Sequence, residues 1–236
     1  MLLSEAEKGS PQAMLSLGNL YEQGVGAPRN LIKALEWYQK AADADMAEGY
    51  YNVGVAYEIG LGNSGDLPRA VQNFEKAAQK GLPQAMEKMA DFYFGGVGVK
   101  QDNAKGIQYL TRAANAGSSQ AANTLGVICL NGLAGQKKDP GKSMTWLTRS
   151  ADAGNLEAMK NLAVIYKDGL GRKADSTKAL TWYLIAVQGG YNTPDLQNIV
   201  ETLKAGMSEK NIQTAEKEAE AWIKKFVDNM QKKAKG

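Results

Sequence analysis

Apolar and small residues recur along the chain with a period of 36 or 37 residues. The recurring large position is occupied by Tyr21, Tyr57, Tyr93, Cys129 and Tyr166. Four residues before each of them stands a large apolar residue, and the next residue is always Gly or Ala. Within one copy the apolar positions lie three and four residues apart, which is the spacing of a helix face rather than the alternation of a strand. Five copies in register therefore predict a repeat architecture built from helices.

Glycine and short polar residues predict where two helices of each copy end and begin. Three residues after each large position is a glycine suited to a left-handed helix cap, at Gly24, Gly60, Gly96, Gly132 and Gly169. After the following turn comes a residue placed as an N-cap, at Asn30, Asp66, Asp102, Asp139 and Asp175. Each copy is thus predicted to be a helix pair. One pair cannot bury its own apolar face, so stacking of neighbouring copies supplies the core.

Both ends of the chain deviate from the repeat. Residues 1–8 align with the last part of a second helix, so we expect the chain to start inside a repeat. Thr193 and Pro194 begin another helix of the first type, and a final helix starts near Ser208. Its expected apolar stripe is Ile212, Ala215, Ala219, Trp222, Phe226 and Met230. We therefore expect residues 1–206 to form the repeat array and residues 207–236 a capping helix with a basic tail.

Composition excludes several kinds of chemistry. The chain has no histidine and one cysteine, Cys129, which removes histidine-dependent nucleophiles, histidine-ligated metals and an internal disulfide. Twenty-eight basic residues against 25 acidic ones are too nearly balanced for a nucleic-acid footprint. The longest uncharged run, residues 113–136, is rich in Gly and in polar residues, so we expect no membrane insertion. The predictions are no enzyme activity, no cofactor, no metal and no nucleic-acid partner.

Two short motifs imitate nucleotide-binding loops. Gly60, Gly62 and Gly65 are spaced as G-x-G-x-x-G, but a predicted helix precedes them where a dinucleotide fold has a strand. Gly-x-Gly also recurs in other copies, which favours turn geometry. Residues 141–143, Gly-Lys-Ser, end like a phosphate-binding loop but lack its first glycine. Neither motif is predicted to bind a nucleotide.

When the copies are aligned, the recurring positions form columns. Taken together, these columns resemble the Sel-one-like repeat family, relatives of tetratricopeptide repeats. The first copy reads Leu17, Gly18, Tyr21, Gly24, Gly26, Lys33, Ala34, Trp37, Tyr38, Lys40, Ala41 and Ala42. The resemblance covers residues 1–191, with Asp45 in place of the glycine between repeats and Asn73 in place of an aromatic residue as departures. It implies an all-α, right-handed α-solenoid of about five to six helix-turn-helix repeats with a C-terminal capping helix. It also implies a scaffold for other proteins, without catalysis.

By similarity to tetratricopeptide arrays, the first helices line a concave face. Side chains that differ between copies on that face are the candidate partner-binding residues: Tyr51, Glu58, Glu87, Asp91, Phe94, Asn123, Leu130, Lys160 and Lys167. Phe94 and Leu130 stand in a column that is charged in the other copies, which favours an apolar partner anchor. The alternative interpretation is that both pack on the adjacent Gly-rich loop.

The functional hypothesis is a module that binds another protein and inhibits or sequesters it. A bacterial immunity protein or regulator is the example, with a secreted toxin or a membrane signalling protein as partner. The alternative is a non-catalytic scaffold or adaptor of the bacterial cell envelope, or a host-interaction factor. Bacterial members of the family are often exported, so we expect a periplasmic location, with the leader lying outside this chain. A single cysteine is equally compatible with the cytoplasm.

Overall fold

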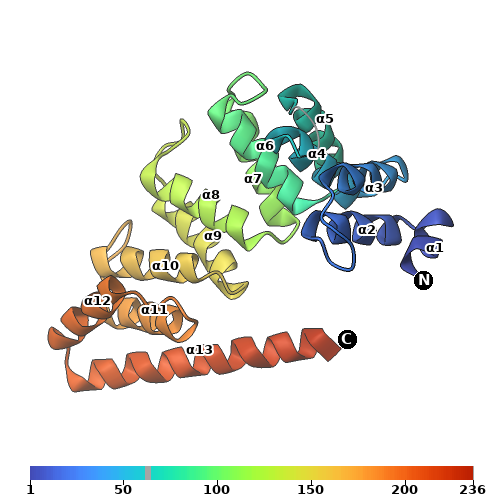
Figure 1. Ribbon diagram of the computed structural model, residues 1–236. Coiled ribbons are helices and arrows are strands. Elements are labelled where there is room, and N and C mark those ends of the chain that lie inside the picture. Colours follow the sequence, from blue (N-terminus) through green and yellow to red (C-terminus); the bar gives the residue numbers. More distant parts are fainter. Residues whose placement is uncertain (62–64, 236) are drawn as a thin grey trace. The chain divides into compact units, whose positions relative to one another are not determined.

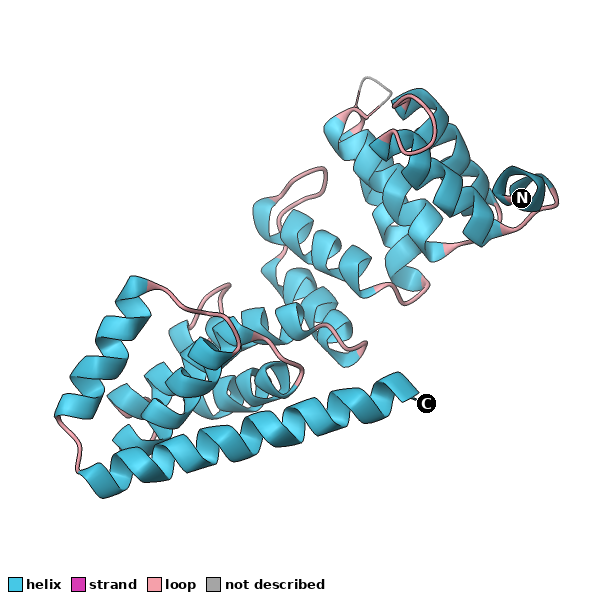
Figure 2. Ribbon diagram, turned by 60° about the horizontal axis from the view of Figure 1, so that its bottom comes forward, coloured by secondary structure: helices cyan, strands magenta, loops and turns pink. Residues whose placement is uncertain are grey.

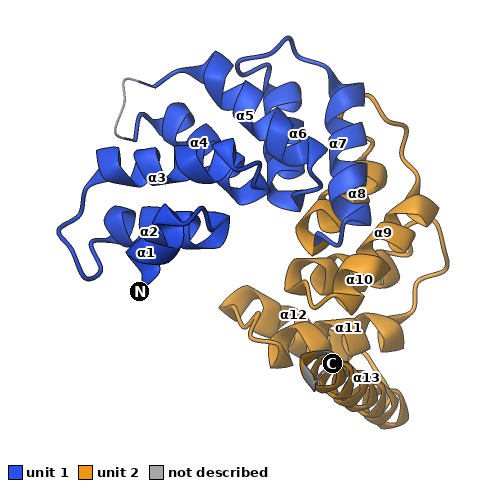
Figure 3. Cartoon of the chain, turned by 90° about the vertical axis from the view of Figure 1, so that its right-hand side faces the viewer, with its two compact units in different colours: residues 1–118 blue, residues 119–236 orange. Residues whose placement is uncertain are grey.

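The computed structural model describes residues 1–61 and 65–235, and in that part of the chain it contains helices and no strand (Figures 1 and 2). The helices are α1 Leu2–Glu7, α2 Pro11–Gln23, α3 Leu31–Asp43, α4 Ala47–Ile59, α5 Leu67–Gln79, α6 Pro83–Gly95, α7 Asn103–Asn115, α8 Ser119–Asn131, α9 Pro140–Asp152, α10 Leu156–Asp168, α11 Ser176–Gln188, α12 Pro194–Ala205 and α13 Glu209–Lys235. They divide into two compact units, residues 1–118 (unit 1) and 119–236 (unit 2), coloured separately in Figure 3. The predicted all-α repeat fold is confirmed.

The predicted caps are confirmed at both kinds of helix end. In α3, α5, α7, α9 and α11 the N-cap side chain accepts a hydrogen bond from the amide three residues later, at 2.9 to 3.0 Å. The five cap glycines have φ between 66° and 73°, a region that costs other residues steric strain. In every copy a glycine therefore marks the end of the first helix and a side-chain cap the start of the second.

In unit 1 the Gly or Ala position of each first helix lets that helix pack closely on a large side chain of the second helix. A Cβ added to Gly18 would lie 2.4 Å from Cε1 of Tyr38, so the ring occupies the space that a side chain would need. Tyr38 is fully buried together with Ala34 and Val53. Glycine or alanine in this column is thus a requirement of close helix contact.

In unit 2 the main apolar cluster runs from Leu147 on α9 to Ala219 on α13. The ring of Trp222 lies edge-on to Trp182 at 5.8 Å and stacks on Phe226 at 5.2 Å. The predicted stripe on the last helix is wrong at Met230, which is 52% exposed. The helix continues beyond the core that its earlier residues cover.

The turn between the first and second repeats has Asp45 where the other turns between repeats have glycine, as the sequence shows. Asp45 has φ of 66°, whereas the matching glycines have φ between 88° and 105°. Its carboxylate pairs with the ammonium group of Lys80. An aspartate thus takes the left-handed position that glycine fills elsewhere.

Candidate partner-binding surface

On the first helices of unit 1, an ion pair joins two repeats. Nζ of Lys88 on α6 lies 3.0 and 3.1 Å from the two carboxylate oxygens of Glu58 on α4. The two side chains are 34% and 22% exposed, so the pair is partly shielded from water. Glu58 is a predicted site residue, and Lys88 is one that the sequence analysis missed. Lys88 is the single charged residue in a column that is otherwise Ser16, Asn52, Thr124 and Asn161, which is the signal that could have found it.

Two other candidates of unit 1, Tyr51 and Asp91, interact electrostatically with this pair, and Glu87 interacts with Tyr51. Burial raises the pKa of Tyr51; the charge of Lys88 opposes the rise, and Glu58 and Glu87 add to it. Burial likewise raises the pKa of Asp91, again opposed by Lys88 and reinforced by Glu58. The structure therefore brings Tyr51, Glu58 and Asp91 near Lys88, with Glu87 near Tyr51. Within the described residues, the side chains of Glu87 and Asp91 form no hydrogen bond or ion pair.

In the first repeat, the residues at the positions equivalent to Tyr51 and Glu58 make contacts within the protein. Leu15, in the column of Tyr51, is only 9% exposed and belongs to a core cluster. Glu22, in the column of Glu58, accepts a hydrogen bond from the hydroxyl of Tyr38 at 2.5 Å. Positions that align in sequence are thus not equally available to a partner.

Phe94 is half-buried and lies over a glycine of the next helix. A Cβ added to Gly106 on α7 would stand 2.5 Å from Cε1 of Phe94. The other copies have Ala34, Ala70, Ser143 and Ala179 at this position. The large ring and the missing side chain are complementary, so Phe94 packs on helix α7. Its role as a partner anchor stays a prediction.

In unit 2 the candidates on α8 and α10 already have partners within the unit. Asn123 is 7% exposed and accepts a hydrogen bond from Asn161 at 3.1 Å. Nζ of Lys160 lies 2.7 Å from a carboxylate oxygen of Glu157 and donates to the hydroxyl of Tyr191 at 3.0 Å. Burial alone would raise the pKa of Glu157, but hydrogen bonds from Lys160 and Tyr191 and the charge of Lys160 lower it. These contacts stabilise unit 2 itself.

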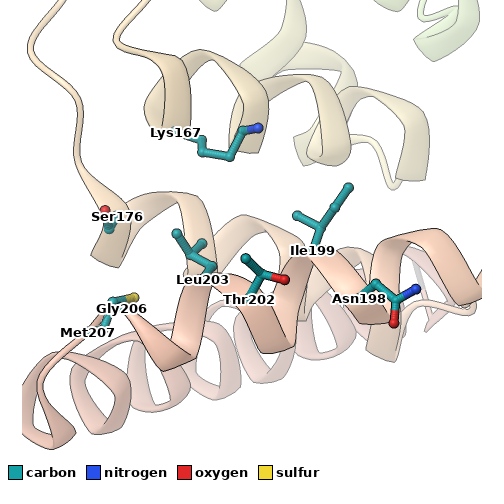
Figure 4. Close-up of a pocket in the computed structure, with 8 residues that line it drawn as sticks. All are labelled: Lys167, Ser176, Asn198, Ile199, Thr202, Leu203, Gly206 and Met207. Carbon is teal, nitrogen blue, oxygen red and sulfur yellow. The ribbon is translucent and has the colours of Figure 1, made fainter.

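The last two candidates of unit 2 differ in their surroundings. Leu130 is partly buried against the apolar cluster of the unit. Lys167 borders an open groove of about 370 Å³, which α12 lines on its other side (Figure 4). Its ammonium group lies 3.3 Å from a carboxylate oxygen of Asp168.

The groove adds Asn198 and Thr202 of α12 to the surface, and sequence reasoning missed both. They stand five and nine residues after the N-cap Thr193, as Lys160 and Val164 stand after the N-cap Asn155. The N-cap register was therefore the signal that could have included α12 in the candidate columns.

The remaining chemical features of the chain are modest. Cys129 is partly buried, and burial raises the pKa of its thiol. Across residues 1–61 and 65–235 there is no group of three or more Cys, Asp or Glu side chains that could hold a metal ion. Gly60 and Gly65 have the positive φ of turn glycines, while Gly62 lies outside the described residues. In the same part of the chain no helix combines the length and the apolar character needed to cross a bilayer.

Comparison with known proteins identifies the repeat. The Sel1 repeat model matches residues 11–46, 47–82, 83–118, 119–155 and 156–191. The chain belongs to the Sel1 repeat family. These boundaries agree with the period read from the sequence, and no curated protein sequence matches the chain.

Solved structures of Sel1 repeat proteins share the fold. One is a Sel1 repeat protein from Oxalobacter formigenes, 31% identical over 94% of this chain and 89% of that chain, with a TM-score of 0.75. Another is a protective antigen present in uropathogenic Escherichia coli strains, 27% identical over 93% of this chain but 48% of that one, with a TM-score of 0.80. An immunity protein from Pseudomonas aeruginosa, 24% identical over 80% of this chain and 72% of that chain, has a TM-score of 0.54 and shows the common fold alone.

Membership of this family has a functional meaning at a coarse level. Sel1 repeats generally mediate protein–protein interaction, and their fold is typically a non-catalytic scaffold. That the side chains differing between copies on the first helices give this member its specific partner stays a prediction.

Proposed function

We propose that this protein binds another protein through the first helices of its repeats and inhibits or sequesters it, without catalysing a reaction. The observation that carries the proposal is the cluster around Lys88 in unit 1. Tyr51 and Glu58 are partly shielded there, while the side chains of Glu87 and Asp91 have no hydrogen bond or ion pair within the described residues. Such a group of aromatic and charged side chains has the composition of a protein-binding hot spot with a polar rim.

The absence of histidine from all 236 residues supports a binding role rather than an enzymatic one, because the commonest general base is missing. A bacterial immunity protein or regulator in the periplasm is the specific form that we propose, with a secreted toxin or a signalling protein as partner. The fold shared with the immunity protein from P. aeruginosa is compatible with that form. A scaffold of the cell envelope is the alternative, and inhibition of the partner distinguishes the two.

The test is capture of the partner from an extract of the source cells, followed by titration with the purified partner. The double variant Glu87→Lys/Asp91→Lys should weaken binding at least tenfold, since neither carboxylate accepts a hydrogen bond or forms an ion pair within the described residues and both can pair with a basic group of the partner. Glu36→Lys on α3 is the matched control, because Glu36 is an exposed acid on a second helix of the same unit. Equal loss in both variants, or no loss, would contradict the proposed surface.

Assays of the partner's own activity complete the test. A one-to-one complex in which the partner loses activity supports the inhibitor, whereas binding without loss of activity supports the scaffold. The midpoint of thermal unfolding of each variant shows that the effect is one of binding and not of folding.

A further inference from the structure

The groove beside Lys167 has an apolar wall and a charged rim. It lies in unit 2 between the end of α10, the beginning of α11, α12 and the turn that follows it (Figure 4). The lining residues that matter for binding are Lys167, Asn198, Ile199, Thr202, Leu203 and Met207. A volume of about 370 Å³ falls within the range of sites that hold small ligands or anchoring side chains.

Three apolar side chains form one part of this groove. Ile199 and Leu203 point from α12 toward the helix that carries Lys167, and Met207 follows in the turn (Figure 4). Ile199 is 37% exposed and lies beside the polar residues Asn198 and Thr202. Removal of such apolar surface from water by a partner is favourable and stabilises the complex.

The charge of the groove comes from one residue. Lys167 is the only charged side chain among the lining residues given above, and its ion pair is with the next residue in the chain, Asp168. Both side chains are well exposed, at 39% for Lys167 and 45% for Asp168, so water screens the ion pair. The ammonium group of Lys167 can therefore exchange Asp168 for another carboxylate. Unit 2 as a whole is basic, with 17 Lys and Arg against 12 Asp and Glu, whereas unit 1 has 11 against 13.

We propose that this groove binds a segment of the partner protein in which a large apolar side chain stands next to a carboxylate. The apolar side chain covers Ile199, Leu203 and Met207, and the carboxylate pairs with Lys167. Asn198 and Thr202 supply hydrogen-bond donors between the two parts. The proposal rests on the proposed function and specifies the chemistry that the partner presents to unit 2: a basic segment would meet Lys167 with like charge, and a purely polar one would leave the apolar wall in water.

The first test uses two capped hexapeptides as probes, one with leucine directly before glutamate and one with leucine directly after it. Each is titrated into the whole chain carrying labelled methyl groups on Ile, Leu and Met, and the shifts are followed by nuclear magnetic resonance. We expect saturable shifts concentrated on Ile199, Leu203 and Met207, with a dissociation constant on the order of 1 mM. Replacing the glutamate of the better peptide by glutamine should weaken binding at least fivefold. Absence of saturable shifts at these methyl groups with both peptides would overturn the proposal.

Charge reversal provides the second test. Lys167→Glu should reverse the preference, so that a peptide with lysine in place of glutamate binds better than the original. Lys137→Glu is the matched control, because Lys137 is an exposed lysine of the same unit that does not line the groove. A reversal in both variants would show a general charge effect and would contradict the assignment to this groove.

A third variant tests the apolar wall. Ile199→Ser should weaken peptide binding at least fivefold, with only a small fall in the midpoint of thermal unfolding because the side chain is 37% exposed. Full retention of binding in this variant would also overturn the proposal.

The outcomes separate this inference from the proposed function. If a captured partner binds the wild type and Lys167→Glu equally well, the groove assignment is wrong and the proposed function stands. If the peptides bind as expected but no partner protein is found, the groove assignment stands and the proposed function loses its support.

Discussion

The two units use the same repeat columns in different ways. In unit 1, the side chains of Glu87 and Asp91 form no hydrogen bond or ion pair within the described residues. In unit 2, the corresponding face holds Lys160 in a network with Glu157 and Tyr191. A residue that differs between copies is therefore not automatically a binding residue, because some of the variation serves contacts inside the unit.

This difference changes where we expect partner contacts. In unit 1 they centre on the side chains around Lys88, as the sequence pattern indicated. In unit 2 they move away from Lys160 toward Lys167 and the groove on α12. Mutations that separate stability from binding can test each half of the comparison.

The largest stability effect is expected at the pair formed by Phe94 and Gly106 in unit 1. Gly106→Ala should lower the free energy of unfolding by about 1–3 kcal/mol, because the new Cβ would overlap the ring of Phe94. In a Phe94→Leu background the same change should cost less, because a smaller side chain covers the glycine. Urea unfolding of the four proteins in this cycle measures the coupling. Equal effects in both backgrounds would mean that Phe94 is free of α7 and belongs wholly to the binding surface.

Unit 2 carries a polar residue at the position where unit 1 has alanine or glycine. The hydroxyl of Ser143 is fully buried and has no hydrogen-bond partner within the described residues. Ser143→Ala should raise the free energy of unfolding by about 1 kcal/mol or somewhat more, since an unsatisfied buried hydroxyl is removed. Urea unfolding gives the value, and Ser176→Ala at the exposed start of α11 is the control. A loss of stability would indicate that the hydroxyl has a partner in solution.

A smaller effect should show that Lys160 is structural. Lys160→Met removes the ion pair with Glu157 and the hydrogen bond to Tyr191, and should cost about 1 kcal/mol because the side chains are partly exposed. Glu87→Gln in unit 1 is the counterpart and should leave stability unchanged. If the two substitutions had equal effects on the midpoint of unfolding, the contrast between the units would be wrong.

The smallest expected effect is a pH dependence of opposite sign in the two units. Folding raises the pKa of Asp91 above its usual 3.8. The ionised carboxylate therefore lowers the stability of the fold as the pH rises from 3.8 through the pKa of the folded state. Folding lowers the pKa of Glu157 below its usual 4.5, so its contribution is present above 4.5 and is lost as pH falls through the folded value. From pH 3 to 7, Asp91→Asn should gain stability relative to wild type and Glu157→Gln should lose it. Unfolding midpoints across this range measure both, and parallel curves would contradict the assigned environments.

Local chemistry made much of this fold predictable. The N-cap residues and the left-handed glycines act on amides and carbonyls within a few residues, so their positions in the sequence already specify the helix ends. The small column was predictable for a related reason, because Gly18 permits close approach of Tyr38 in the same copy. Contacts inside one repeat are encoded at short sequence separation.

The candidate site was less predictable because its contacts join different repeats. Glu58 and Lys88 are 30 residues apart, and Asn123 and Asn161 are 38 apart. A column in the alignment identifies positions of equal geometry, but it does not show which neighbour a side chain meets. Leu15 and Tyr51 share a column, yet Leu15 is buried in the core and Tyr51 is half-buried.

The sequence by itself determined the repeat, its period, the helix boundaries and the membership of an all-α family, because these depend on periodic burial and on backbone caps within a copy. Only the tertiary structure decided which variable side chains already have partners and that α12 forms a groove with Lys167. The physical reason is that partner choice, burial and groove shape are set by which repeats stand side by side, and side chains from separate copies meet only after the helices have stacked.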